Sequence, residues 1–275
     1  MKFSLSTNWC NQRIDSGEEI ADKILALGFD GMELGFNTTQ LQVKGFKQRL
    51  NELPVTSIHA FCPVPISAPQ GYPELYPLAS TDENSRAIAR VHVRKNINFA
   101  AEMGAGVVVL HAGRVPCGGL FGSEMSRRIK RGLKLLDTFK HELEMLLPDL
   151  ERGKVVLGLE NLPYLEGYPA EWELKDVVGD YVRPWLDTGH DFVRQQKGWR
   201  KEPFPINPVG LHLNDSKGGD DHLPPGTGMV DFAAIRYFAE TASDHLVLEP
   251  HSGVSETDLT ASLNYLRQLW MGESK

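Results

Sequence analysis

Short apolar runs alternate with longer amphipathic segments along the whole chain. The runs consist mainly of Val, Ile and Leu and are bounded by Gly or Pro, which is typical of strands buried on both faces of a parallel sheet. We expect strands at residues 3–7, 30–35, 55–60, 106–111, 154–160, 182–187, 209–213 and 245–249. Helices are predicted near residues 17–28, 39–52, 83–103, 123–147, 171–178, 191–200, 231–241 and 256–271.

This alternation predicts an α/β fold, a single (β/α)8 TIM barrel that occupies residues 1–275 as one domain. Eight parallel strands with intervening helices close into such a barrel, and about 250 residues suffice to build it. Ser16 and Glu19 have the spacing of a capping box and predict where the first long helix begins. In this fold the functional residues lie at the C-terminal ends of the strands and in the loops that follow.

Six of the predicted strands end at a residue that can bind a metal ion. These residues are His59, His111, Glu160, Asp187, His212 and Glu249. Because the C-terminal strand ends meet at one mouth of a barrel, we expect these side chains to share a pocket. A single buried histidine is often structural, but a carboxylate such as Glu160 is rarely buried without a partner, since removing its water is costly.

Three further candidates, His190, Asp220 and His222, follow these strand ends and bring the candidate ligands to nine. Imidazole and carboxylate groups without thiolates favour zinc or manganese. One catalytic zinc takes about three protein ligands, so the set indicates up to about three ions, two of them bridged by Glu160. The alternative is one ion held by Glu160, Asp187, His212 and Glu249, with the other residues supporting or packing around it.

Composition and charge limit the possible classes of partner. The formal net charge of −7 argues against a broad surface for nucleic acid. The three cysteines have no paired spacing, which predicts neither disulfides nor a thiolate zinc site. No apolar stretch approaches the roughly 20 residues that span a bilayer, and no signal peptide is evident. We therefore expect a cytoplasmic protein that does not bind membranes.

Three segments, LENLP, LDTGH and HLNDSKGGDDH, resemble the xylose isomerase-like TIM-barrel superfamily, and the resemblance extends over nearly the whole chain. This superfamily includes sugar phosphate isomerases and epimerases and AP endonuclease family 2. Its isomerases hold one metal ion, which implies the ligands Glu160, Asp187, His212 and Glu249. Endonuclease IV-like members hold three zinc ions, which implies the additional ligands His59, His111, His190, Asp220 and His222.

The resemblance also bears on the substrate. The segments LGFDGMELGF and LPPGTGMVDF are similar to small-molecule isomerases, and no counterpart of the DNA-inserting loops of endonuclease IV is found. DNA is therefore a poor candidate substrate, and a small sugar-containing or phosphorylated molecule is favoured. Trp185 could form one wall of a sugar pocket or could belong to the barrel core. Glu33, near the end of the second strand, could orient a ligand histidine.

We expect one of two enzymatic activities. The first is hydrolysis of a phosphoester by a multinuclear zinc site, with Lys217 or Arg114 binding the phosphate unless they are ordinary solvated side chains. The second is isomerisation or epimerisation of a sugar or sugar phosphate at a single metal ion. Both assign the catalytic groups to Glu160, Glu249 and Asp187. A sugar-binding protein without catalysis is a third hypothesis, which so complete a ligand set disfavours.

Overall fold

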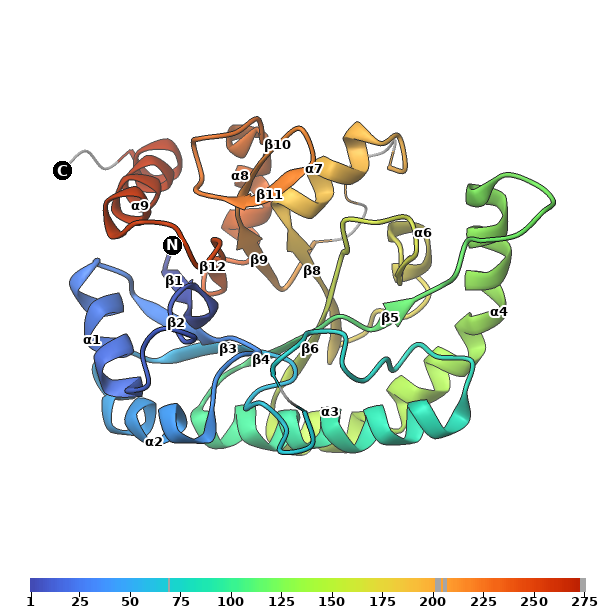
Figure 1. The fold of residues 1–275 in the computed structure, drawn as a ribbon, viewed down its shortest axis with the longest axis horizontal. Helices are drawn as coiled ribbons and strands as arrows, with labels where there is room; N and C mark the ends of the chain where they lie inside the picture. The colour runs from blue at the N-terminus through green and yellow to red at the C-terminus, as the bar shows by residue number, and fades with distance from the viewer. Residues whose placement is uncertain (69, 201–203, 205–206, 273–275) are drawn as a thin grey trace.

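The computed structural model describes residues 1–68, 70–200, 204 and 207–272. Eight parallel strands form a closed barrel in the order β1-β12-β9-β8-β6-β4-β3-β2, which confirms the predicted TIM barrel (Figure 1). The strands are β1 (Phe3–Ser6), β2 (Gly31–Leu34), β3 (Val55–His59), β4 (Val107–Leu110), β6 (Val156–Glu160), β8 (Val182–Asp187), β9 (Gly210–Leu213) and β12 (Leu246–Leu248). Each lies close to its predicted range.

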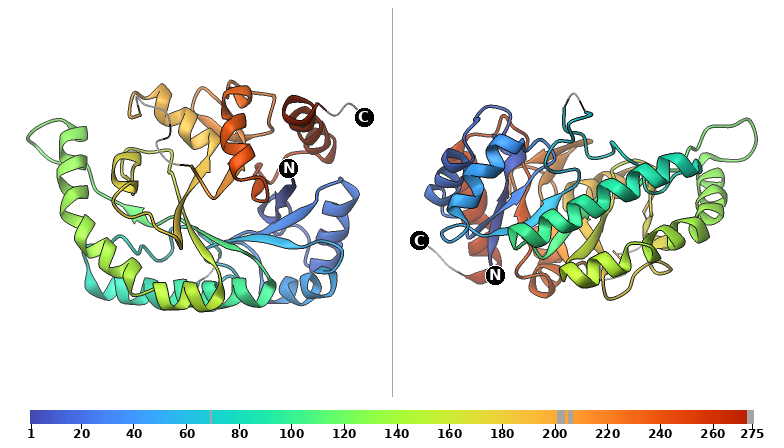
Figure 2. Two further views of the ribbon diagram at one scale, coloured as in Figure 1. Left: turned by 180° about the vertical axis from the view of Figure 1, so that it is seen from behind. Right: turned by 90° about the horizontal axis from the view of Figure 1, so that it is seen from below.

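Helices surround the barrel and cover its outer face (Figure 2). They are α1 (Gly17–Ala26), α2 (Gln40–Arg49), α3 (Glu83–Met103), α4 (Glu124–Glu144), α5 (Leu147–Gly153), α6 (Glu171–Leu174), α7 (Thr188–Gln196), α8 (Phe232–Thr241) and α9 (Glu256–Met271), with a short 3₁₀ turn, η1 (Thr7–Trp9), after β1. The predicted capping box forms in part, since Ser16 Oγ accepts a hydrogen bond from the Glu19 amide. Within the described part of the chain, no helix is both long enough and apolar enough to cross a membrane.

Three of the predicted helices differ most from those in the structure. The predicted helix at 123–147 is two helices, because Pro148 lacks the N–H that a continuing helix needs and instead lies in the first turn of α5. The predicted helix at 171–178 is shorter, since α6 ends at Leu174. Helix α7 begins at Thr188 rather than near 191, because the Asp187 carboxylate accepts a hydrogen bond from the His190 amide and caps the helix directly at the strand end.

Two small antiparallel pairs at the C-terminal face of the barrel were not predicted. Strands β5 (Gly113–Arg114) and β7 (Gly167–Tyr168) pair with each other, and β10 (Asp215–Lys217) pairs with β11 (Asp220–Leu223). Asp215 fixes the loop after this second pair, because its carboxylate accepts hydrogen bonds from the amides of Gly226, Gly228 and Val230. These pairs hold the loops that surround the mouth of the barrel.

Trp185 on β8 fills the interior of the barrel. Its side chain is 0% exposed and packs with Val107, Val109 and Val247. Gly210 on β9 makes room for it, because a Cβ atom at this position would lie 2.0 Å from the indole ring. The indole ring lies 5.0 Å from the ring of His212, measured between centroids, and so supports the polar end of the barrel from below.

Candidate metal centre

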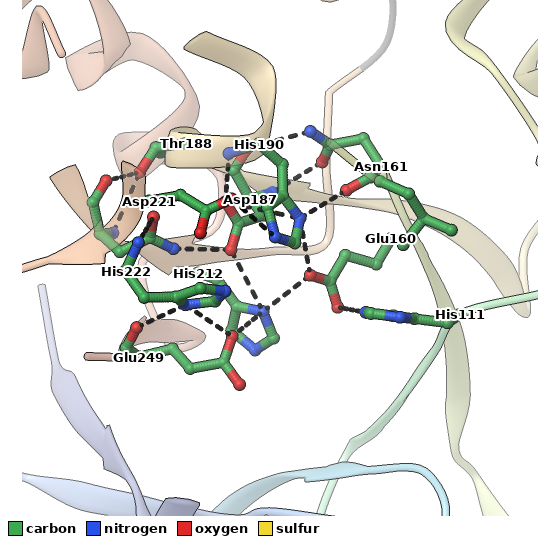
Figure 3. Close-up of polar contacts among 12 residues, drawn as sticks. His111, Glu160, Asn161, Asp187, Thr188, His190, His212, Asp221, His222 and Glu249 are labelled. Atoms are coloured by element: carbon green, nitrogen blue, oxygen red, sulfur yellow. Dashed lines mark hydrogen bonds and ion pairs between the residues drawn. The ribbon is translucent and has the colours of Figure 1, made fainter. Parts of the chain in front are cut away.

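Eight of the nine predicted ligands converge at the C-terminal mouth of the barrel. Figure 3 shows seven of these side chains pointing toward one another from different strands and loops. Seven of the eight are buried, and His222 is partly exposed. They are His59, His111, Glu160, Asp187, His190, His212, His222 and Glu249. The parallel barrel explains this meeting, because its strand ends share one face.

Glu160, at the end of β6, lies among four histidines. Its Oε2 atom is 3.3 Å from Nε2 of His59 and 3.1 Å from Nε2 of His111. Its Oε1 atom is 3.3 Å from Nδ1 of His212 and 3.4 Å from Nδ1 of His190. Neither carboxylate oxygen has a well-aligned hydrogen-bond partner among the described residues, although both are buried. A buried carboxylate in this condition suits coordination to cations, which would satisfy both oxygens.

Two groups of side chains have the spacing needed to hold an ion. In the first, ligand atoms of His59, Glu160, His212 and Glu249 all lie within 4.8 Å of one another. In the second, the same holds for Asp187, His190 and His222. The groups adjoin, since Oδ2 of Asp187 is 3.9 Å from Nδ1 of His212. Nitrogen and oxygen ligands of this kind fit zinc or manganese.

Backbone carbonyls fix the orientation of several histidines. Nδ1 of His59 donates to the carbonyl of Ala60 at 3.0 Å, and Nδ1 of His222 donates to the carbonyl of Glu249 at 2.9 Å. A carbonyl oxygen can only accept, so each ring carries its proton on Nδ1 and presents an unprotonated Nε2 when neutral. This arrangement leaves Nε2 of His59 facing Glu160.

Glu33 fixes the orientation of the His212 ring. Its carboxylate is completely buried, accepts a hydrogen bond from Oγ of Ser57 at 2.8 Å, and lies 3.1 Å from Nε2 of His212. With Nε2 occupied in this way, Nδ1 of His212 is directed at Glu160 and Glu249, at 3.3 and 3.0 Å. A carboxylate behind a ligand histidine fixes the ring and makes it a stronger donor to a metal.

The electrostatics of the site favour bound positive charge. Burial alone would raise the pKa of Glu160, but His111 and His212 outweigh it and hold that pKa well below its usual range. Burial would likewise lower the pKa of His111, but Glu160 and Glu74 raise it to about 9. For His212 the fields of Glu249, Glu33 and Glu160 overcome burial and raise the pKa well above its usual value. In the absence of a metal ion, the acidic groups thus keep protons on His111 and His212.

The structure does not bring Asp220 to this site. Its side chain is 66% exposed, and its Oδ1 lies 3.7 Å from Nε2 of His251 at the surface. Asp221 instead places Oδ2 3.8 Å from Nε2 of His190 (Figure 3). Neighbouring side chains of a strand point to opposite faces, so the pairing of β10 with β11 decides which of the two acids faces inward. Asp221, and not the predicted Asp220, is therefore the acid of this hairpin that faces the candidate ligands.

The structure places the three residues that were expected to contact substrate in different environments. Arg114 lines the cavity above the site. Lys217 is exposed on the β10–β11 hairpin and is absent from the cavity lining, so the structure does not support its role as a phosphate ligand. Trp185 is part of the barrel core and supports His212 instead of forming a pocket wall.

A cavity of about 360 Å³ opens directly above the candidate metal ligands. Besides these residues its lining includes the neutral polar side chains Asn8, Gln12, Asn37, Tyr72 and Ser252, together with Phe36, Glu74, Arg114, Tyr164 and His251. Sequence analysis missed Asn8, whose Nδ2 donates to Oε1 of Glu249 at 3.3 Å. It also missed Glu74, which approaches His111 from the loop that follows β3.

The fold and the site together define a TIM-barrel protein with a buried His, Glu and Asp set suited to divalent metal ions. The family described as xylose isomerase-like TIM barrel matches residues 21–269, and the chain belongs to this family. The uncharacterized protein MJ1311 of Methanocaldococcus jannaschii is 26% identical over 172 residues, which cover 57% of this chain and 54% of that protein. The match thus spans about half the length of this curated relative.

Solved structures resemble the whole chain. A D-tagatose 3-epimerase-like protein has a TM-score of 0.69 and 22% identity, with 98% of this chain and 97% of that chain covered. The TTHB071 protein of Thermus thermophilus, soaked with ZnCl2, has a TM-score of 0.67 and 23% identity, with both chains covered over 100%. Other similar structures include D-psicose 3-epimerase and L-ribulose 3-epimerase. At these identities the likeness concerns the fold.

Proposed function

We propose that this protein is a divalent-metal-dependent epimerase or isomerase of a small sugar. The observation that carries the proposal is the pair of carboxylates, Glu160 and Glu249, at the floor of the cavity. Both are buried, and they approach the same atom, Nδ1 of His212, at 3.3 and 3.0 Å. Two acids that converge on one metal-binding histidine beneath a sugar-sized cavity suit the transfer of a proton from and to a substrate carbon.

The first group of ligands, with His212 and Glu249, would hold the ion at the cavity floor. A bound divalent ion supplies polarisation of a substrate carbonyl, which makes the neighbouring C–H bond more acidic. Glu160 and Glu249 are the residues in reach to remove this proton and to return it. Asn8 donates a hydrogen bond to Glu249 and keeps its carboxylate directed at the cavity.

The names of similar solved structures support this proposal over phosphoester hydrolysis. D-tagatose 3-epimerase-like protein, D-psicose 3-epimerase and L-ribulose 3-epimerase share the fold of this chain over nearly its full length. The expectation of hydrolysis depended on the number of ligands and on phosphate binding by Lys217 or Arg114. Lys217 lies outside the cavity lining, and Asp220 lies outside the metal-binding groups.

One observation keeps hydrolysis as the second candidate. Asp187, His190 and His222 form a separate group of ligands beside the first, and Asp221 lies close enough to join it. Two or more ions a few ångströms apart can activate water and stabilise the leaving oxygen of a phosphoester. A single-metal epimerase would use Asp187 from this group and has no need of His190 and His222 as ligands.

Solvent isotope exchange tests the proposal. The metal-loaded protein is incubated in D₂O with D-tagatose or D-fructose, and deuterium at carbon is measured by mass spectrometry or NMR. We expect deuterium in the recovered sugar and in its epimer. The variants Glu160→Gln and Glu249→Gln should exchange at background rate, while Glu151→Gln, an exposed change on α5, should match the wild type. Cleavage of a phosphoester without any carbon exchange would favour the second candidate instead.

A further inference from the structure

The charged side chains at the cavity mouth are already paired. Apart from the histidines around Glu160 and Glu249, the cationic residues among the described cavity lining are Arg114 and His251. Arg114 binds Glu74 through two contacts, from Nε to Oε2 at 2.5 Å and from Nη2 to Oε1 at 3.1 Å. Nε2 of His251 faces Oδ1 of Asp220 at 3.7 Å.

The pair formed by Arg114 and Glu74 is fixed in place. The guanidinium carbon of Arg114 lies 3.7 Å from the centre of the Tyr164 ring, a cation–π arrangement that holds the group against the cavity wall. The Glu74 side chain is only 10% exposed, and its Oε1 also lies 3.8 Å from Nδ1 of His111. Glu74 therefore cannot turn toward solvent without losing its contacts with both Arg114 and His111.

This pairing matters for the charge of a substrate. A phosphate group needs unpaired cations or free backbone amides, and a bidentate arginine is the usual choice. Here the two-point face of Arg114 is occupied by a carboxylate, and an anion brought to Arg114 would also meet the negative charge of Glu74. The neutral polar groups of the lining, Asn8, Gln12, Asn37, Tyr72 and Ser252, can instead donate to and accept from hydroxyl groups.

We propose that the cavity accepts an uncharged sugar in preference to its phosphorylated form, and that Glu74 determines this preference by neutralising Arg114. The inference rests on the proposed function, because it concerns the substrate of the same site. It makes Glu74 a specificity-determining residue, not a catalytic one. It also predicts that removing one negative charge at the mouth turns Arg114 into a phosphate site.

Calorimetric binding of D-fructose and D-fructose 6-phosphate to the metal-loaded protein tests the proposal. We expect the wild type to bind the free sugar more tightly than the phosphate. The variant Glu74→Gln keeps the shape of the side chain but releases Arg114, and its affinity for the 6-phosphate should rise by about tenfold or more. A wild-type protein that prefers the phosphate, or that binds neither sugar, contradicts the proposal.

Phosphate can also coordinate a metal ion, so a control must separate the two effects. In the double variant Glu74→Gln/Arg114→Met the gain for the 6-phosphate should disappear, whereas binding to the metal would persist. If the gain persists, Arg114 is not its source and the assignment is wrong. The single variant Arg114→Met provides a second test that does not depend on Glu74→Gln folding. It leaves Glu74 without its arginine partner and should weaken binding of the 6-phosphate relative to the free sugar.

The two proposals can fail independently. Deuterium exchange with a free sugar reports the chemistry at Glu160 and Glu249, whether or not Glu74 controls charge selectivity. The ratio of the two binding constants reports selectivity, whether or not any proton is transferred. Exchange that proceeds equally well with the phosphorylated sugar would refute the inference about Glu74 and leave the proposed function standing.

Discussion

Replacing Glu33 by Gln should weaken metal binding while leaving the fold nearly intact. Glu33 is fully buried and lies outside the cavity lining, so its effect must pass through His212, whose Nε2 lies 3.1 Å away. Losing such a support behind a ligand histidine lowers metal affinity by about 10- to 100-fold. This corresponds to about 1.4 to 2.8 kcal/mol of binding free energy. The glutamine keeps the volume of the side chain and can still accept from Ser57.

Metal affinity is measured by competition with a coloured chelator, and stability by urea denaturation of the metal-free protein. The matched control is Glu173→Gln, which removes an equally buried carboxylate from its two-point pair with Arg128. We expect this control to lower the free energy of unfolding by about 3 to 5 kcal/mol and to leave metal affinity unchanged. Equal metal affinity in Glu33→Gln and wild type would refute the idea that Glu33 orients His212.

The barrel interior, the hairpin and the protonation of the site can each be tested as well. Trp185→Ala should lower the free energy of unfolding by about 3 to 5 kcal/mol in urea denaturation, because the indole fills the barrel interior; a change below about 1 kcal/mol would contradict that role. Asp221→Asn should lower the amount of metal bound at full loading while Asp220→Asn should not, and the reverse result would favour Asp220 as the ligand. Burial lowers the pKa of His111, but Glu160 and Glu74 outweigh this effect and raise the pKa to about 9. Zinc binding should therefore release protons, and the affinity for zinc should increase from about pH 6 to about pH 8. Calorimetric heats of binding that do not depend on the buffer would contradict this.

The barrel could be predicted because its strands are buried on both faces and therefore appear as continuous apolar runs. Such runs can be recognised without knowing which residues lie close together in space. The residue at the C-terminal end of each run faces the mouth of a parallel barrel. This explains why His59, His111, Glu160, Asp187, His212 and Glu249 were predicted to meet and why the structure brings them together.

The loops could not be predicted in the same detail. The choice between Asp220 and Asp221 depends on the register of a short hairpin, which contains an irregularity between Asp215 and Lys217. The contact between Glu74 and Arg114 joins positions 40 residues apart, and no periodic pattern in the sequence predicts it. Trp185 was ambiguous for another reason, since a large aromatic at a strand end can face either a pocket or the core, and the space left by Gly210 decides for the core.

We expect the histidines and acids around Glu160 to hold a divalent metal ion. Elemental analysis of the purified protein, before and after dialysis against zinc or manganese, tests it most directly. We expect at least one tightly held divalent ion in the wild type and the loss of this ion in Glu160→Ala and His212→Ala. A wild-type protein that retains no metal after loading, or variants that retain the same amount as the wild type, would contradict it.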